Sequence, residues 1–293
     1  MFVYYTVEQY ITNMSLNAST GPSPSVRPQR GLVAGLLDQS QARGMWVVAV
    51  DELARAAGLS DLAARRQLER LTPRVVRLPG RPSTVLLVSP EHRVRGAPPV
   101  ANWLDAYFRF RSQPYYVGLL SAAALHGSSQ QALQITQVLT TKPMRAIEIG
   151  RLHIDFHVKA NLASTPLAQL AGMPAPLAVS TAEATAIDLI AFNHCIGGIR
   201  RATQVIADMR SAITVSGLKR ALAAESQTAT KQRLGYVLTV LGLDRMAAEV
   251  QKSLPRRLAV AALQTQAPSH HSTQEICRPW WVLDNIGLER ELA

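Results

Sequence analysis

The most constraining part of this sequence lies between residues 50 and 88, where two short helical segments are followed by two β-rich segments. The first helical segment stops at Gly58, and Ser60 can cap the second by accepting a hydrogen bond from a free backbone N–H. The β-rich runs flank a Pro/Gly loop that carries Arg81, which predicts a hairpin. Helix, tight turn, helix and hairpin is the order of a winged helix-turn-helix, whose second helix enters the DNA major groove.

The apolar spacing of the second helix predicts one buried face and one basic face. We expect its apolar face to pack on the first helix. The residues concerned are Ala64, Leu68 and Leu71 on the second helix and Leu53, Ala54 and Ala57 on the first. Arg66 and Arg70 lie opposite this stripe and are the first candidates for contacts with base edges. Arg65 and Gln67 flank the stripe and are the next candidates.

Three further arginines of this segment are candidates for contacts with the DNA backbone. Arg77 and Arg81 belong to the predicted hairpin, where they would meet phosphates or the minor groove. Arg55 sits on the first helix, which usually crosses the backbone. Two other interpretations stay open: a helix hairpin whose arginines are merely solvated, or a small module that docks protein.

The charge distribution suits a polyanionic partner and is densest in this segment, although a generally basic surface that binds no partner would show the same excess. The chain of 293 residues carries a net charge of +11, and a basic excess promotes binding to phosphates through counterion release. Residues 27–96 hold 12 Arg, no Lys and 6 acidic residues. The planar fork of Arg can bond guanine O6 and N7 together, so Arg suits base recognition.

The remainder of the chain predicts a mixed α/β domain preceded by a boundary near residues 95–99. Helices are expected at residues 32–42, 100–111, 117–126, 181–191, 199–209, 215–224, 228–241 and 244–253. Strands are expected at residues 45–49, 134–141, 152–158 and 280–283. The fold class is therefore α+β, with an N-terminal winged helix-turn-helix followed by a larger mixed α/β domain. We expect an N-terminal arm (1–30), a DNA-binding domain (31–96), an α/β domain (97–255) and a partly irregular C-terminal extension (256–293).

Several segments resemble the AbiEi antitoxin family over about residues 30–255. Besides the winged-helix segment, these are Tyr115-Tyr-Val-Gly-Leu-Leu-Ser-Ala-Ala-Ala-Leu-His-Gly, Leu152-His-Ile-Asp-Phe-His, Val179-Ser-Thr-Ala-Glu-Ala-Thr-Ala-Ile-Asp-Leu and Arg233-Leu-Gly-Tyr-Val-Leu-Thr-Val-Leu-Gly. The first resembles the helix that opens the family's second domain, the second a strand, the third a strand-to-helix step and the fourth a late helix.

This resemblance implies a DNA-binding half of a type IV abortive-infection toxin–antitoxin pair. Such proteins have an N-terminal winged helix and a C-terminal antitoxin domain, and they repress their own operon at inverted repeats near the promoter. They also counter a nucleotidyltransferase-like toxin, usually without a stable complex. Beyond the resemblance, we expect the second domain to supply contacts between DNA-bound copies.

The main alternative function is that of an endonuclease. It is suggested by the expected strand at residues 152–158, whose alternating pattern places several polar side chains on one face. His153, Asp155, His157 and Lys159 share one face, and three such groups can converge on an ion. With Glu183 or Asp188 they would form a carboxylate cluster for Mg²⁺ and phosphodiester hydrolysis. A solvated polar strand face explains the same alternation without chemistry, and we favour that interpretation.

Other candidate chemistry is weaker. The run from His126 to Ser129 hints at a nucleotidyltransferase turn, but the second metal-binding acid is missing. A zinc site drawn through His194, Cys195, His270, His271 and Cys277 has the wrong pair spacing. Lys231, Arg233, Arg256 and Arg257 would form either a second basic surface for flanking DNA or a solvated helix face.

The sequence therefore predicts a DNA-binding repressor and antitoxin rather than an enzyme. We expect no catalytic residues, metal or cofactor, and double-stranded operator DNA as the partner. Two cysteines cannot form a disulfide framework, the first residues do not resemble a signal peptide, and no long uncharged apolar run is present. These features predict a cytoplasmic protein that does not associate with membranes.

Overall fold

The computed structural model describes residues 31–128, 135–170, 172–173, 175–264 and 275–289. They form a mixed α+β structure that divides into two compact units. Unit 1 comprises the described residues up to Ser112 together with Ile149–Leu152, and unit 2 comprises the rest. The expected N-terminal arm lies outside the described residues, and the expected boundary after residue 96 stays a prediction.

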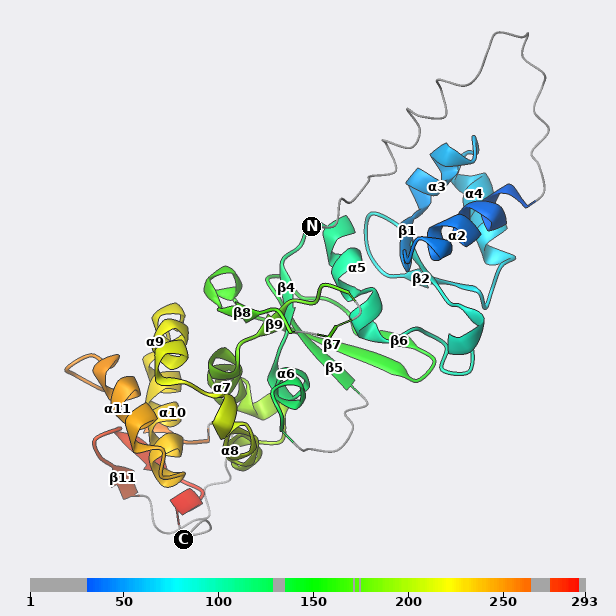
Figure 1. The fold of residues 1–293 in the computed structure, drawn as a ribbon. Helices are drawn as coiled ribbons and strands as arrows, with labels where there is room; N and C mark the ends of the chain where they lie inside the picture. The colour runs from blue at the N-terminus through cyan, green and yellow to red at the C-terminus, as the bar shows by residue number, and fades with distance from the viewer. Residues whose placement is uncertain (1–30, 129–134, 171, 174, 265–274, 290–293) are drawn as a thin grey trace, which may run out of the picture. The chain divides into compact units, whose positions relative to one another are not determined.

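Unit 1 contains three helices packed with a three-stranded antiparallel sheet, and a further helix follows (Figure 1). The elements are α2 (Leu32–Ala42), β1 (Val47–Ala49), α3 (Val50–Ala56), α4 (Asp61–Glu69), β2 (Val75–Leu78), β3 (Thr84–Leu87) and α5 (Leu104–Phe110). The sheet order is β1-β3-β2, so the hairpin strand β3 lies in the middle. The helices at 32–42 and 50–69, the strand before α3 and the hairpin are thus confirmed.

Local sequence signals explain the turn between α3 and α4. Gly58 has a positive φ of 62°, a conformation that glycine adopts without steric cost. The hydroxyl of Ser60 accepts a hydrogen bond from the N–H of Ala63 at 3.3 Å, so Ser60 is the N-cap of α4. Beneath this turn, Ala64 and Leu68 of α4 share one hydrophobic core with Leu53 of α3. The predicted packing of the two helices is therefore confirmed.

Unit 2 is built on a six-stranded mixed sheet in the order β6-β7-β5-β4-β9-β8. Its strands are β4 (Tyr115–Val117), β5 (Ile135–Thr140), β6 (Ile147–Ile149), β7 (Leu152–Val158), β8 (Leu167–Ala168) and β9 (Val179–Ser180). The pairs β5–β7 and β4–β9 are parallel, and β4–β5 and β8–β9 are antiparallel.

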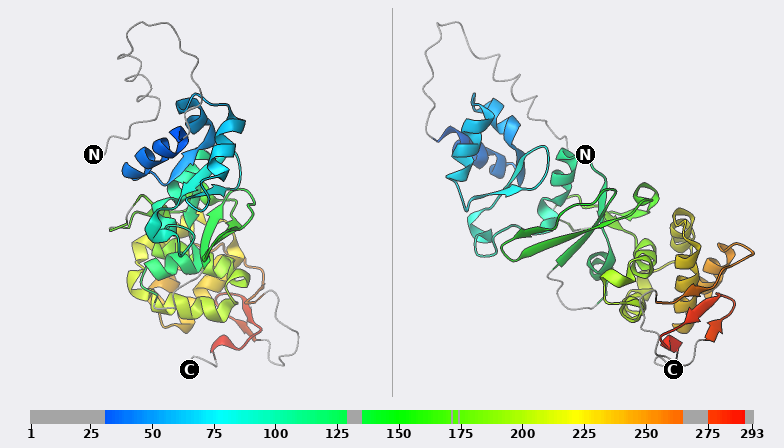
Figure 2. Two further views of the ribbon diagram at one scale, coloured as in Figure 1. Left: turned by 90° about the vertical axis from the view of Figure 1, so that its right-hand side faces the viewer. Right: turned by 180° about the vertical axis from the view of Figure 1, so that it is seen from behind.

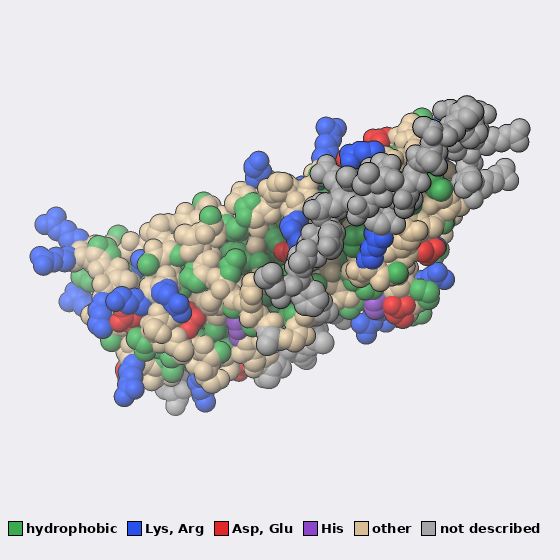
Figure 3. All heavy atoms as spheres, turned by 45° about the horizontal axis from the view of Figure 1, so that its top comes forward, with side chains coloured by type: hydrophobic (Ala, Val, Ile, Leu, Met, Phe, Trp, Pro, Cys, Tyr) green, Lys and Arg blue, Asp and Glu red, His purple; other side chains and the backbone are tan. Residues whose placement is uncertain are grey.

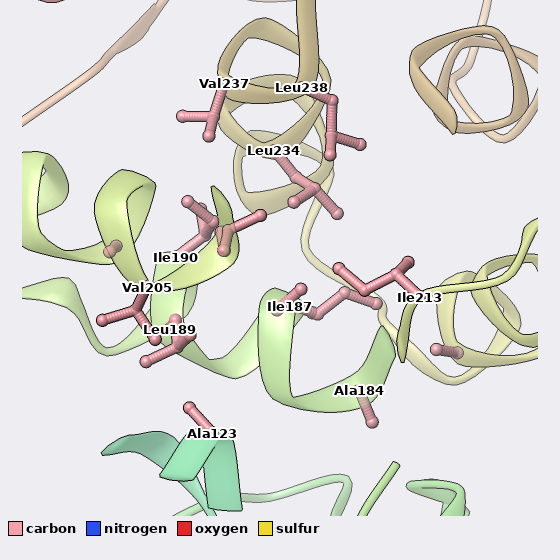
Figure 4. Packing of buried hydrophobic residues seen from close by; sticks show 14 of the residues in the cluster. Ala123, Ala184, Ile187, Leu189, Ile190, Val205, Ile213, Leu234, Val237 and Leu238 are labelled. Atoms are coloured by element: carbon pink, nitrogen blue, oxygen red, sulfur yellow. The ribbon is translucent and has the colours of Figure 1, made fainter. Parts of the chain in front are cut away.

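Helices cover the sheet and extend the core away from it. They are α6 (Leu119–Leu125), α7 (Ala182–Ala191), α8 (Ile199–Asp208), α9 (Val215–Ala224), α10 (Thr228–Val240) and α11 (Asp244–Lys252). Helix α7 is central, because its residues 182–190 are all buried. Its apolar side chains Ile187, Leu189 and Ile190 meet residues from α6, α8 and α10 (Figure 4). A helix that is buried on all sides needs no amphipathic pattern.

A small C-terminal sheet packs onto α10 in unit 2 (Figure 2). It consists of β10 (Ala261–Ala262), β11 (Glu275–Cys277) and β12 (Val282–Asp284) in the order β10-β12-β11. The ring of Trp280 lies against Gly235 of α10, where a Cβ would overlap ring atoms. The indole N–H of Trp280 donates to Thr239 Oγ1 at 3.1 Å, which secures the same contact.

Two sequence-based assignments need correction. The helix expected at residues 117–126, which the family resemblance extended back to Tyr115, is preceded by strand β4 at Tyr115–Val117, and the short helix α6 follows from its N-cap Gly118. The helix expected at residues 100–111 starts as a 3₁₀ turn at Val100–Asn102 and becomes α-helical only at Leu104. In the first case the β propensity of two tyrosines and a valine, paired with β5 and β9, overrides the helical pattern.

The contact at Gly235 gives a stability prediction. Gly235→Ala should lower the free energy of unfolding by about 1–3 kcal/mol, because the added methyl group overpacks the Trp280 ring. Gly35→Ala in α2 is the matched control, since a Cβ there meets nothing within 4 Å. It should stabilise by about 0.5–1 kcal/mol. Urea unfolding measures both, and a Gly235→Ala variant as stable as the parent would contradict this packing.

Candidate nucleic-acid interface

Helix α4 presents a basic surface to solvent because its apolar stripe faces the core of unit 1. Ala64 and Leu68 are buried, whereas Arg65 and Arg66 are exposed. Arg70 follows as the C-cap residue and is also exposed. The solvent side of α4 therefore carries Arg66 and Arg70 about one turn apart, with Arg65 nearer the edge of the buried stripe.

The hairpin adds two more exposed arginines to unit 1. Arg77 lies on β2 opposite Val85 of β3 and is exposed, whereas Val75 and Leu78 at the two ends of the strand are buried. Arg81 is exposed in the loop that connects β2 to β3. Arg77 lies on the same strand face as buried Val75, so its exposure marks the place where this face of the hairpin leaves the core.

These five arginines differ from some other cations of unit 1, which have acidic partners among the described residues. Within the described residues, Arg65, Arg66, Arg70, Arg77 and Arg81 form no ion pair. By contrast, Arg74 is paired with Asp38 of α2, and Arg109 with Asp105 of α5. An unpaired exposed guanidinium keeps its donors available for phosphate or base edges.

The other two candidate residues, Arg55 and Gln67, are less available for contacts with DNA. Arg55 lies on α3 and is exposed, but its guanidinium is 3.9 Å from the carboxylate of Asp51 one turn earlier. Gln67 is half-buried beside the apolar stripe of α4. Sequence reasoning did not include Leu62, whose side chain on the first turn of α4 is 60% exposed. An apolar side chain at such a position can contact a thymine methyl group.

Unit 2 carries a separate set of exposed basic side chains. Figure 3 shows Lys and Arg side chains gathered where α9 and α11 lie. The exposed members of these helices and of the segment that follows α11 are Lys219, Arg220, Arg245, Lys252, Arg256 and Arg257. Of the residues that the sequence grouped here, Arg256 and Arg257 are exposed. Arg233 is half-buried, and its Nε donates to the carbonyl of Ala262 at 2.7 Å, so it has a structural role.

A buried ion pair lies beneath the sheet of unit 2. Lys159 Nζ is 2.7 Å from Asp188 Oδ1, and the Tyr116 hydroxyl donates to Asp188 Oδ2 at 2.8 Å. Burial raises the pKa of Asp188 even though Lys159 and Tyr116 oppose that shift. Burial also raises the pKa of Tyr116, and the adjacent Asp188 carboxyl adds to this, so the phenol is a neutral donor. Removing one member would leave a buried charge unpaired.

The residues of the endonuclease alternative are engaged in three different interactions. His153 Nε2 lies 2.8 Å from Asp155 Oδ1 on β7, and Lys159 is held by Asp188. Glu183 accepts hydrogen bonds from the backbone N–H and the hydroxyl of Thr214, at 2.9 and 2.8 Å. Within the described residues, no group of three His, Cys, Asp or Glu side chains is placed to hold a metal ion.

The zinc alternative falls partly outside the described structure. His270 and His271 are not among the described residues, while Cys195 and Cys277 are described and are not joined in a disulfide. His126 ends α6, and its Nε2 donates to the carbonyl of Ser180 at 2.6 Å. That carbonyl belongs to β9, so His126 links the end of α6 to the sheet.

Comparison with known families decides the class of the larger unit. Residues 116–240 match the family model of the AbiEi antitoxin C-terminal domain. This part of the chain is an AbiEi antitoxin domain. The resemblance that the sequence motifs indicated is thereby confirmed over those residues. The AbiEi domain contains the sheet from β4 to β9 and helices α6 to α10.

The fold has also been seen in a solved structure. The crystal structure of the RV2827C protein from Mycobacterium tuberculosis superposes with a TM-score of 0.58 and 17% sequence identity, covering 92% of this chain and 98% of that chain. At that identity the likeness shows the fold alone. No curated protein matches the sequence significantly. Within the described residues, no helix is both long enough and apolar enough to cross a membrane.

The carboxylate of Glu183 gives a pH prediction. Burial opposes its ionisation, but hydrogen bonds from Thr214, from the backbone of Glu183 itself and from Thr181 together outweigh burial and hold the pKa of Glu183 below its usual value. A lowered folded-state pKa contributes stability above the unfolded pKa of about 4.3, and this contribution is lost as pH falls through the folded value. Glu183→Gln should therefore lose less stability than the parent between neutral pH and about pH 3.

Urea unfolding across that pH range measures the effect. Glu69→Gln, which changes an exposed carboxylate on α4, is the control and should follow the parent. Parallel pH curves for the parent and Glu183→Gln would show that Glu183 is not the group responsible.

Proposed function

We propose that this chain is a DNA-binding transcriptional repressor and antitoxin of a type IV, AbiE-like toxin–antitoxin system. Unit 1 would act as a winged helix-turn-helix that binds promoter repeats of its own operon. The AbiEi domain would counter a nucleotidyltransferase-like toxin without forming a stable complex. Both roles place the protein in the cytoplasm and require no catalysis by this chain.

The observation that carries the proposal is the combination of an unpaired basic helix with an adjacent basic hairpin. The element order α2-β1-α3-α4-β2-β3 and the sheet order β1-β3-β2 support a winged helix. In that arrangement α4 is the recognition helix, and Arg66 and Arg70 are its groove-facing residues. Arg77 and Arg81 would bind the phosphate backbone.

The positions of the arginines in unit 1 support separate roles for α4, in base recognition, and for the hairpin, in phosphate binding. Guanidinium groups on α4 can form bidentate bonds to guanine, which provides sequence specificity. Arginines on the hairpin neutralise phosphates, which adds affinity that depends on salt rather than on sequence. Arg55 would contribute a backbone contact, and Arg65 and Gln67 would add further contacts in the groove.

The expected effect of removing the recognition arginines is a loss of specific binding. Arg66→Ala with Arg70→Ala should cost about 1–3 kcal/mol for each lost base contact. Fluorescence anisotropy on a duplex covering the chain's own promoter region measures the change, with a scrambled duplex for comparison. The double variant should lose affinity for the promoter more than for the scrambled duplex.

A charge-matched control separates recognition from bulk electrostatics. Arg93→Ala with Arg95→Ala also removes two exposed arginines of unit 1, but neither residue lies on α4 or the hairpin. This control should retain most of the promoter preference. If both double variants lose equal affinity, or if the parent shows no promoter binding, α4 is not the reading helix.

The antitoxin role predicts a second, separable outcome in cells. A nucleotidyltransferase-like gene beside the gene for this chain should arrest growth when expressed alone, and co-expression of the full chain should restore growth. The Arg66→Ala, Arg70→Ala variant should still restore it, because the AbiEi domain at residues 116–240 does not include α4. Failure of the parent chain to restore growth would contradict the antitoxin role.

A further inference from the structure

The hairpin loop of unit 1, residues 79–83, is held by side chains from α5 and the residue that caps it. The carbonyl of Pro79 accepts a hydrogen bond from the Tyr107 hydroxyl at 2.8 Å and another from Arg111 Nη1 at 3.1 Å. A carbonyl oxygen has two lone pairs, so these two donors use both. The loop that carries Arg81 is therefore fastened at its first residue.

Packing around the guanidinium group tightens the same contact. The Arg111 guanidinium carbon lies 5.4 Å from the centroid of the Tyr107 ring, within cation–π range. Gly80 has a φ of 105°, and a Cβ at this position would overlap Arg111 Nη1. Glycine is thus required here both by the backbone conformation and by the close approach of the guanidinium.

Tyr107, which donates one of the two hydrogen bonds to the hairpin loop, is itself held by close packing within α5 and the residues before it. Tyr107 is fully buried, and its ring contacts Trp103 and Phe108 edge to face, with centroids 6.2 and 5.3 Å apart. Trp103 Nε1 donates to the carbonyl of Pro98 at 3.2 Å. Burial raises the pKa of Tyr107 despite the opposing effect of Arg111, so its hydroxyl stays protonated and able to donate. The hairpin loop is therefore bonded to α5, whose contacting side chain is buried and packed against other aromatic rings.

We propose that Tyr107 and Arg111 are positioning residues for DNA binding, which hold the hairpin loop so that Arg77 and Arg81 meet the duplex backbone in a fixed geometry. The inference rests on the proposed function of unit 1. A loop that is ordered before binding pays no ordering entropy when the complex forms. The fastening at Pro79 therefore contributes to affinity through Arg81, without either positioning residue contacting DNA.

Tyr107→Phe tests the inference, because it deletes one hydroxyl and keeps the buried ring. Affinity for the fluorescein-labelled promoter duplex should fall about three- to tenfold, the effect of one hydrogen bond. In an Arg81→Ala background the same substitution should change affinity by less than about twofold, since linked residues give non-additive losses. The slope of log K against log salt should also become shallower, by up to about one, as a phosphate contact weakens.

Two further variants keep the test decisive. Gly80→Ala displaces Arg111 from the loop side and should show the same dependence on Arg81. Tyr236→Phe is the matched control: it also removes a buried hydroxyl, the one that donates to Asp284 in unit 2 at 2.8 Å. It should leave promoter affinity and the salt slope unchanged. Thermal unfolding of each variant verifies that the chain is folded at the assay temperature.

The outcomes separate this inference from the function on which it rests. Promoter binding that depends on Arg66 and Arg70, together with equal losses from Tyr107→Phe with and without Arg81, would overturn the positioning role alone. Unchanged affinity in both Tyr107→Phe and Gly80→Ala would also overturn it. A parent chain that does not bind the duplex would instead overturn the proposed function.

Discussion

The burial of Ala64 and Leu68 is the constraint from which the properties of unit 1 follow. These two residues, one helical turn apart, join the side chains of α2, α3 and the hairpin in a single core. Because a helix with one buried stripe must turn its opposite side to solvent, the arginines of α4 are exposed by the same packing that stabilises the helix. The fold of unit 1 and its basic surface therefore depend on the same contacts, and a loss of core packing would also change the direction in which the arginines of α4 point.

The AbiEi domain shows a different use of charged residues. Asp188 and Glu183 lie on α7, which is buried on all sides, and each carboxylate has compensating donors: Lys159 and Tyr116 for one, Thr214 for the other. Buried charges need such partners, since an unpaired one costs several kcal/mol. The acidic residues that first seem suitable for metal chemistry are thus already occupied in holding the helix against its neighbours.

Much of unit 1 could be predicted from sequence because its signals are local. Gly58, Ser60 and the apolar spacing of α4 lie within a dozen residues of one another, and the structure confirms each. Strand β4 was missed because Tyr115–Val117 is short and is followed directly by a helix, so that only pairing with distant strands makes it β. The contact between Arg111 and Pro79 was also missed, since two residues 32 positions apart in sequence leave no local pattern. DNA binding by the five arginines depends on a second molecule, so no pattern within this chain establishes it.

The most direct test of the account asks whether α4 itself reaches the duplex. A photo-crosslinking amino acid in place of Leu62, which is exposed on the first turn of α4, would report contact without removing an arginine. The same probe in place of Val94, which is 87% exposed in unit 1 but lies outside α4 and the hairpin, is the comparison. The account predicts a promoter adduct at position 62 that unlabelled promoter duplex competes away, and little adduct at position 94. An adduct at position 94 alone, or none at position 62 under conditions where the duplex is bound, would contradict it.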